Sequence, residues 1–220
     1  MKEMTSRERV LAVLNHEEPD RVPVDIGSNI TTTMVLAGYK KLKKYLDINE
    51  SPNILISRMF QSIEMDERIL KRLQVDFRPV FYRGPKRWKD IEGPNDTYVD
   101  EWGLKLKRAA NGFYYDMIDH PLKNATIEDL ETYSWPDPLD PGRFEGVEKE
   151  ARELHENTDY AVVGPGCSVG FFELSWYLRS LEQLFMDMIL NPDFVHALFR
   201  KVLDIRKYIL GEYLKRVGKY

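Results

Sequence analysis

Residues 159–180, DYAVVGPGCSVGFFELSWYLRS, decide the fold class that we expect for this chain. The first six form a short run with β-branched residues, which indicates a buried strand. Gly164 and Gly166 supply the turn that follows, and an apolar, aromatic segment of helical length begins at Phe171. A strand that leads through a turn into a helix is the repeating unit of parallel α/β folds, so we predict an α/β protein.

Two earlier segments follow the same order. The short apolar runs RVPVDI, residues 21–26, and VDFRPVFY, residues 75–82, predict two more strands of a parallel sheet. Helices are predicted around these strands, and the first begins at Thr5, which forms a capping box with Glu8. The remaining helices are expected at residues 33–46, 65–73 and 143–157, after Thr126, from Phe171, and from Asn191–Pro192 to about Arg216.

Residues 97–118 depart from this pattern. Polar and apolar side chains alternate there on both sides of an Asn-Gly turn, which predicts an inserted antiparallel hairpin. The linker that follows contains Pro136, Pro138 and Pro141, and we expect no regular structure in it. Because no boundary stands out along the chain, we expect a single domain over residues 1–220.

Composition excludes several function classes. Of the 220 residues, 43% are hydrophobic, so the chain can bury a core rather than remain disordered. The 36 acidic and 32 basic residues leave a formal charge of −4, which argues against a nucleic-acid partner. The single cysteine, Cys167, cannot form an internal disulfide and favours a cytoplasmic location. No apolar run approaches the ~20 residues of a membrane span, so we expect no membrane partner.

The loops after the three predicted strands carry the candidate binding residues, because ligands of parallel α/β folds bind at the carboxyl ends of the strands. After the first, Asp25 precedes a run of hydroxyl side chains that either binds a polar ligand or caps the next helix. After the second, Tyr82 and Arg83 stand beside Lys86 and Arg87. A guanidinium suits a carboxylate or phosphate ligand, although a solvated loop with stray charges explains this pattern equally well.

The loop after the third predicted strand is the most informative. Gly164 and Gly166 let the backbone approach a ligand closely, and the helix that follows carries Glu173, Trp176 and Tyr177. The cysteine of this loop has no base beside it in sequence, so an inert buried thiol is the preferred interpretation. The four histidines are scattered singly, and we predict no metal site in this chain.

Several longer segments, taken in order, carry a resemblance to known proteins. They are SRERVLAVLNHEEPDRVPVDIG (6–27), ILKRLQVDFRPV (69–80), DEWGLKLKR (100–108), DHPLKNATIEDLETYSWPDP (119–138) and VVGPGCSVGFFELSWYLRSLEQLFMDMILNPDFVHAL (162–198). Together they resemble the uroporphyrinogen decarboxylase superfamily, and they look most like its branch of cobalamin-dependent methyltransferases. The likeness extends over essentially the whole chain and rests on the order of the segments rather than on one signature.

The resemblance implies a (β/α)8 TIM-type barrel whose mouth holds a tetrapyrrole-sized ligand. A complete barrel takes about 250 residues, so we expect this chain to supply its N-terminal part. The decarboxylases of the superfamily bind the carboxylates of their substrate with an arginine-rich motif, but the matching residues 25–42 contain no arginine. The resemblance also implies an acid after the second strand, but this chain has Tyr82 or Arg83 at about that position. The tyrosine that the resemblance implies after the third strand corresponds to about Trp176 or Tyr177. An unclosed barrel exposes a strand edge and an apolar face, which predicts poor solubility or association.

We therefore expect corrinoid-linked methyl transfer from the complete protein, because a tetra-acid substrate buried in a barrel needs cationic partners. The resemblance implies a corrinoid and a zinc ion as cofactors of a complete family member, with neither bound by this chain alone. The implied partners are a tetrapyrrole or corrinoid ligand, a corrinoid protein and the missing half of the barrel. Two alternatives stay open: uroporphyrinogen decarboxylation in porphyrin biosynthesis, and a non-catalytic fragment or half of a split barrel.

Overall fold

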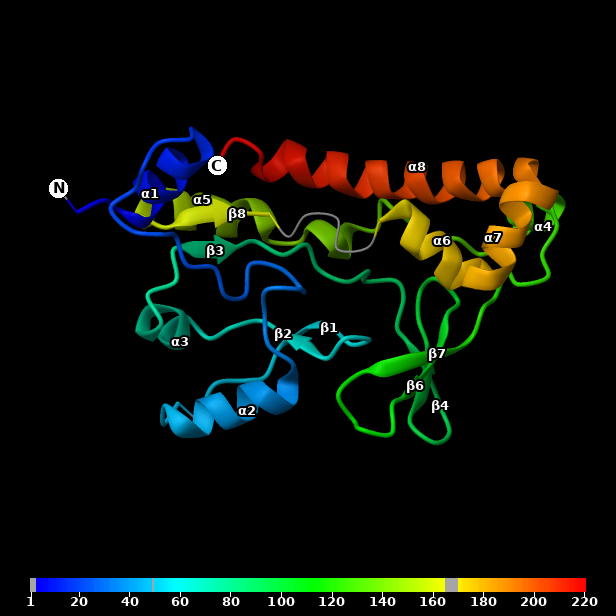
Figure 1. Ribbon diagram of the computed structural model, residues 1–220, viewed down its shortest axis with the longest axis horizontal. Coiled ribbons are helices and arrows are strands. Elements are labelled where there is room, and N and C mark those ends of the chain that lie inside the picture. Colours follow the sequence, from blue (N-terminus) through cyan, green and yellow to red (C-terminus); the bar gives the residue numbers. More distant parts are fainter. Residues whose placement is uncertain (1–2, 49, 165–169) are drawn as a thin grey trace. The chain divides into compact units, whose positions relative to one another are not determined.

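The computed structural model describes residues 3–48, 50–164 and 170–220, and Figure 1 traces the elements along the chain. The chain divides into two compact units. Unit 1 consists of Met1–Tyr82, Gly146–Ser168 and Lys215–Tyr220, and unit 2 consists of Arg83–Glu145 and Val169–Leu214.

Unit 1 begins with α1, Ser6–Leu14, which starts where the sequence predicts. The hydroxyl of Thr5 accepts from the amide of Glu8 at 3.1 Å, and the Glu8 carboxylate accepts from the amide of Thr5 at 2.8 Å. The predicted capping box is therefore confirmed, and it satisfies two backbone donors that the first helical turn leaves unpaired.

The other helices of unit 1 are shorter than predicted. α2 spans Leu36–Tyr45, α3 spans Glu67–Arg72 and α5 spans Val147–Asn157. The helix predicted from Arg143 begins later because Gly146 has a φ of 80°. This left-handed conformation does not belong to a right-handed helix, so α5 starts just after it.

The predicted parallel pairing is confirmed for two strands of unit 1. β3, Phe77–Pro79, and β8, Ala161–Val163, run parallel, with Phe77 opposite Ala161. The amide of Val80 donates to the carbonyl of Val163 at 2.9 Å, which extends the pairing past the end of β3. The α/β class is thus confirmed, whereas the partial barrel stays a prediction.

The strand predicted over residues 21–26 is wrong. The amide of Asp76 donates to the carbonyl of Val24 at 2.9 Å, but the amide of Val24 donates to the Asp76 carboxylate at 2.8 Å. A side chain thus takes the place of a backbone acceptor, and no ladder forms. A short antiparallel pair, β1 (Leu55–Ser57) and β2 (Ser62–Ile63), was not predicted.

The apolar core of unit 1 joins α2, β2 and α3. Tyr39, Ile63 and Ile69 are fully buried in one cluster. The hydroxyl of Tyr39 accepts from the amide of Asp66 at 3.0 Å, so the buried phenol has a partner just before α3 begins.

Unit 2 contains the inserted antiparallel structure, which is larger than the predicted hairpin. Its strands are β4 (Ile91–Gly93), β5 (Thr97–Val99), β6 (Lys105–Arg108) and β7 (Tyr115–Asp119), paired in that order. The Asn-Gly turn lies between β6 and β7, and Gly112 has a φ of 72° that favours glycine.

The helices of unit 2 follow this sheet. They are α4 (Ile127–Thr132), the 3-10 turn η1 (Pro141–Phe144), α6 (Phe171–Arg179), α7 (Leu181–Leu190) and α8 (Pro192–Val217), of which α8 continues into unit 1 from Lys215. The predicted cap at Thr126 and the predicted end of the last helix are confirmed. The expectation of an irregular linker is wrong at Pro141, because proline fits the first position of a helical turn. Within the described residues, no helix is both long and apolar enough to span a bilayer.

Candidate functional site

Several polar side chains of the loop at Asp25 form hydrogen bonds within the loop. The Asp25 carboxylate accepts from the amide of Ser28 at 3.2 Å and from the Ser28 hydroxyl, and the side-chain oxygen of Asn29 accepts from the amide of Thr31 at 2.8 Å. The N-cap of α2 is Val35, which has no side-chain bond to the helix. The idea that these hydroxyls cap α2 is therefore wrong, and binding of a ligand by Asp25 stays a prediction.

The carboxyl ends of β3 and β8 meet at one edge of the parallel pair. Tyr82 follows β3 there and is half-buried, while Gly164 follows β8 directly and is exposed. This is the edge at which parallel α/β folds bind ligands. Gly166 and Cys167, both considered in the sequence, lie outside the described residues.

The basic loop after β3 is largely paired. The amide of Arg83 donates to the carbonyl of Arg143 at 2.8 Å. The ammonium of Lys86 lies 3.4 Å from Glu145, and a guanidinium nitrogen of Arg87 lies 3.1 Å from Asp137. Both ion pairs are well exposed, so water screens them. The loop therefore resembles a solvated loop with scattered charges, the alternative to a binding loop.

The three candidates on α6 come together in unit 2. The hydroxyl of Tyr177 donates to Oε1 of Glu173 at 2.6 Å, four residues earlier on the same helix. The rings of Trp176 and Tyr177 meet edge to face, with centroids 4.4 Å apart. Nδ1 of His120 lies 2.7 Å from the carbonyl of Tyr177, which fixes this turn of α6.

The three residues on α6 differ in burial, and this difference assigns them different roles. Tyr177 is buried, whereas Glu173 and Trp176 are half-buried and can reach a ligand. Burial, together with the bond to Glu173, raises the pKa of Tyr177 well above its ordinary value. The phenol therefore keeps its proton and holds the Glu173 carboxylate in one orientation.

The turn between β5 and β6 contains a carboxyl group with a shifted pKa. Burial raises the pKa of Asp100 to about 7, although the amides of Leu104 and Trp102 each donate to its carboxylate at 2.9 Å. Shifted groups of this kind mark functional sites or structural turns. Here the two amide bonds close the turn, so we assign Asp100 a structural role.

A cleft of about 260 Å³ lies within unit 1, beside β3. Arg78 of β3, Glu67 of α3 and Glu150 of α5 are among its lining residues. Nε of Arg78 donates to Glu67 at 2.6 Å, and the guanidinium lies 3.5 Å from the centre of the Tyr160 ring. This cation already has partners, so the cleft offers mainly carboxylates and apolar surface to a ligand.

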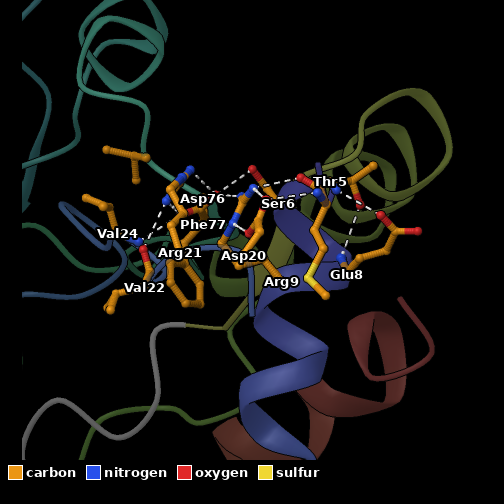
Figure 2. A network of polar contacts seen from close by, with 12 residues as sticks. Thr5, Ser6, Glu8, Arg9, Asp20, Arg21, Val22, Val24, Asp76 and Phe77 are labelled. Carbon is orange, nitrogen blue, oxygen red and sulfur yellow. Dashed lines mark hydrogen bonds and ion pairs between the residues drawn. The ribbon is translucent and has the colours of Figure 1, made fainter. Parts of the chain in front are cut away.

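Sequence reasoning missed a buried charge network at the amino end of β3, which Figure 2 shows from close by. Asp76 is fully buried and accepts from the hydroxyl of Ser6 at 2.8 Å and from Arg9 at 2.7 Å. Arg21 donates to both of its oxygens, at 2.7 and 2.8 Å. Asp20 accepts from Nε of Arg9 at 2.6 Å. The acid within the apolar run VDFRPV was the signal in the sequence, because a buried charge needs partners.

This network stabilises unit 1 and does not form a ligand site. Burial alone would oppose ionisation of Asp76, but the hydrogen bonds from Arg21, Val24 and Ser6 outweigh it and lower its pKa. Asp20 and Arg9 add one negative and one positive charge, so the charges of the two acids and the two arginines in the network balance. The network lies at the strand end opposite the ligand edge, where parallel α/β folds place stabilising residues.

The two pockets described in unit 1 and the described ionisable side chains do not fit the cofactors that the resemblance implies. Among the described residues, no group of three or more His, Cys, Asp or Glu side chains could hold a metal ion. The cleft beside β3 and a hollow of about 540 Å³ along α1 are smaller than the largest pockets for drug-sized ligands, which reach about 1,000 Å³. A corrin ring is larger than such ligands, so we derive no chemical step through zinc or a corrinoid.

Comparisons with known proteins support the fold. No protein-family profile matches the sequence, and no curated protein matches it. Among solved structures, the chain is similar to a methyltransferase from Methanosarcina mazei, with a TM-score of 0.51 and 15% sequence identity. The match covers 97% of this chain and 57% of the methyltransferase, so the chain spans little more than half the length of that structure. At this identity the likeness establishes a shared fold.

Proposed function

We propose that this chain is the front part of a (β/α)8-type barrel that carries out corrinoid-linked methyl transfer in its complete form. The observation that carries the proposal is the likeness in fold to a methyltransferase over 97% of the chain. The parallel pair β3 and β8 supports it, because a barrel of this type is built from such pairs. The single cysteine fits a protein of the reducing cytoplasm.

Methyl transfer is favoured over decarboxylation of a porphyrinogen. A substrate with several carboxylates needs cations along the barrel mouth, because unpaired buried carboxylates are strongly disfavoured. The loop at Asp25 instead contains an acid and hydroxyl groups, and the cations Lys86 and Arg87 are paired with Glu145 and Asp137, respectively.

In this proposal, the cofactors bind to the part of the barrel that this chain does not supply. The chain spans 57% of the solved methyltransferase, which leaves a large part of that fold without a counterpart here. Because no group of described residues could hold a metal ion, and the two pockets described in unit 1 are small for a corrin ring, we assign zinc and the corrinoid to those further elements.

This chain contributes binding residues on α6. Glu173 presents a fixed carboxylate, Tyr177 orients it, and Trp176 offers a flat aromatic surface on which a macrocycle can stack. α6 follows β8 along the chain, in the position where ligand-binding loops of barrels lead into helices.

The test uses the complete protein that contains this sequence, mixed with methylcobalamin and a thiol, with transfer followed by loss of the methylcobalamin absorption. Glu173→Gln should lower turnover roughly tenfold, because it weakens one charged hydrogen bond at the site. Glu131→Gln is the matched control, since Glu131 is exposed on α4. Formation of coproporphyrinogen from uroporphyrinogen, or neither reaction, would refute the proposal.

A second candidate makes this chain one half of a split barrel. The same 57% coverage favours it, because the remaining elements can come from a separate polypeptide. Affinity purification of the tagged chain from its own cells distinguishes the two arrangements. A stoichiometric second polypeptide with βα repeats would support the split barrel, whereas one longer chain carrying this sequence would support a continuous barrel.

A further inference from the structure

The turn between β6 and β7 carries an asparagine followed directly by a glycine, Asn111 and Gly112. No other asparagine of the sequence precedes a glycine. Asn111 is exposed, and among the described residues no atom lies within 4 Å of the position that a Cβ would take at Gly112. Water therefore reaches this turn, and no neighbouring side chain crowds the backbone nitrogen of Gly112.

The side chain of Asn111 folds back over this nitrogen. Its Oδ1 accepts from the amide of Phe113 at 3.0 Å, which is the bond of an Asx turn. Because that amide lies two residues on, the ring that the bond closes brings Cγ of Asn111 over the peptide group between them, which contains the nitrogen of Gly112. The amide of Phe113 also donates to the oxygen on which negative charge develops when Cγ is attacked.

A cation lies beside the same turn. Nη1 of Arg108 donates to the carbonyl of Gly112 at 3.3 Å. The guanidinium is held there by bonds to the Asp96 carboxylate, which offsets part of its charge, and to the hydroxyl of Tyr115 at 2.8 Å. A nearby positive charge favours the deprotonated form of a group. Arg108 therefore helps the nitrogen of Gly112 to lose its proton and become a nucleophile.

One contact opposes attack by this nitrogen. The amide of Gly112 donates to the carbonyl of Ala109 at 2.8 Å, and this bond must break before the nitrogen can react. The turn lies at an exposed tip, where the next two side chains, Phe113 and Tyr114, are 50% and 43% exposed. Little packing holds such a tip closed, so it opens far more often than the whole chain unfolds.

We propose that Asn111 is a site of spontaneous deamidation in the folded chain, with water as the only co-reactant. The nitrogen of Gly112 gives its proton to solvent and forms a bond to Cγ of Asn111. The Cγ–Nδ2 bond breaks, and Nδ2 takes up a proton from water and leaves as ammonia. Water then opens the resulting succinimide ring at either carbonyl, which yields aspartate or isoaspartate without oxidation or reduction. The reaction is favoured because both reacting groups belong to one turn.

The reaction changes the tip in two ways. Both products add a negative charge to the turn beside Arg108, and isoaspartate also adds one carbon atom to the main chain between β6 and β7. The bond from Gly112 to Ala109 depends on the original spacing, so isoaspartate should weaken the pairing of these strands. This inference does not depend on the proposed methyl transfer, since it concerns the chain's own backbone.

The experiment keeps the folded wild-type chain in mildly alkaline buffer and follows its asparagine peptides by mass spectrometry. Digestion in water labelled with heavy oxygen marks any deamidation that occurs during digestion. Asn124 is the internal control, because it is exposed and the amide after it, on Ala125, also donates to a carbonyl three residues back, at 3.1 Å. Asn111 should deamidate at least about tenfold faster than Asn124, because a side chain on the attacking residue disfavours conformations that glycine adopts freely.

Two variants test the chemistry. Asn111→Gln should suppress the reaction, since the longer side chain would have to close a larger ring, and Gly112→Ala should slow it about tenfold. The circular dichroism spectra of both variants should match that of the wild-type chain, because the turn is exposed. Equal rates at Asn111 and Asn124 would overturn the proposal. Deamidation of the urea-unfolded chain without any in the folded chain would overturn it as well, because the turn would then protect Asn111.

Discussion

Replacing Asp76 with asparagine should destabilise unit 1 strongly. Oδ1 of Asp76 accepts from Ser6, Arg9 and Arg21, and Oδ2 accepts from Arg21 and from the amide of Val24. Asparagine keeps the shape and one acceptor oxygen but turns the other position into a donor. Two donors then face that new donor, and the two guanidiniums lose a balancing charge.

The magnitude follows from the burial of this network. The side chains of Asp76 and Arg9 are 0% and 4% exposed, so water replaces little of what is lost. Breaking a buried pair by removal of one partner costs about 3–5 kcal/mol. With a urea dependence of about 2 kcal/mol per molar, the unfolding midpoint should fall by roughly 2 M.

The assay is urea unfolding followed by far-ultraviolet circular dichroism, which reports on the helices of both units. Fluorescence alone is unsuitable, because Trp88, Trp102, Trp135 and Trp176 all belong to unit 2. Glu145→Gln is the control, since it makes the same chemical change in an exposed pair and should cost less than about 1 kcal/mol. Equal midpoints for the two variants would refute the reasoning.

The pH dependence supplies an independent check. The pKa of Asp76 is lower in the folded chain than the ordinary value of 3.8. Its charge therefore contributes stability above that value, and the contribution is lost as the pH falls through the folded pKa. The difference between Asp76→Asn and the wild-type chain should be largest at neutral pH and shrink in acid. A difference that grows in acid would contradict the role of the charge.

Four further substitutions test single turns and caps by urea unfolding. Burial raises the pKa of Asp100 to about 7, so the wild-type chain loses stability as the pH rises from 3.8 to about 7. Asp100→Asn has no carboxyl group to ionise, so at neutral pH it should regain up to about 4 kcal/mol of this lost stability. Gly103→Ala should cost more than about 2 kcal/mol, because φ is 77° and the new Cβ would lie 2.3 Å from the hydroxyl of Tyr133. Gly112→Ala, with a φ of 72° and open space around it, should cost only about 1 kcal/mol. Thr126→Ala should cost about 1 kcal/mol through loss of the cap of α4.

Features that depend on neighbouring residues could be predicted from the sequence. The capping box at Thr5, the helix cap at Thr126 and the Asn-Gly turn before β7 each need only a few adjacent residues. These predictions agree with the structure because local chemistry decides them.

Features that depend on distant residues could not be predicted. The partners of Asp76 lie 55 to 70 residues away along the chain, at Ser6, Arg9 and Arg21. Hydrophobic periodicity carries no information on such partners, so the apolar run 21–26 predicts a strand that the structure does not contain. The length of the antiparallel sheet was underestimated for the same reason, because β4 has exposed residues and little apolar pattern.

The Asp76 carboxylate also explains why residues 21–26 do not form a strand. A third parallel strand beside β3 would need backbone donors at alternate positions. The amide of Val24 faces β3 but is bonded to the Asp76 carboxylate at 2.8 Å, and Pro23 has no amide to offer on the other side. One side chain therefore both pairs with the two arginines and ends the ladder. If this is correct, Asp76→Asn should speed hydrogen exchange at the amide of Val24 more than at the amide of Val80, which bonds to backbone in β8. Equal acceleration at both amides would mean that the carboxylate does not hold this segment, and another cause for the missing strand would be needed.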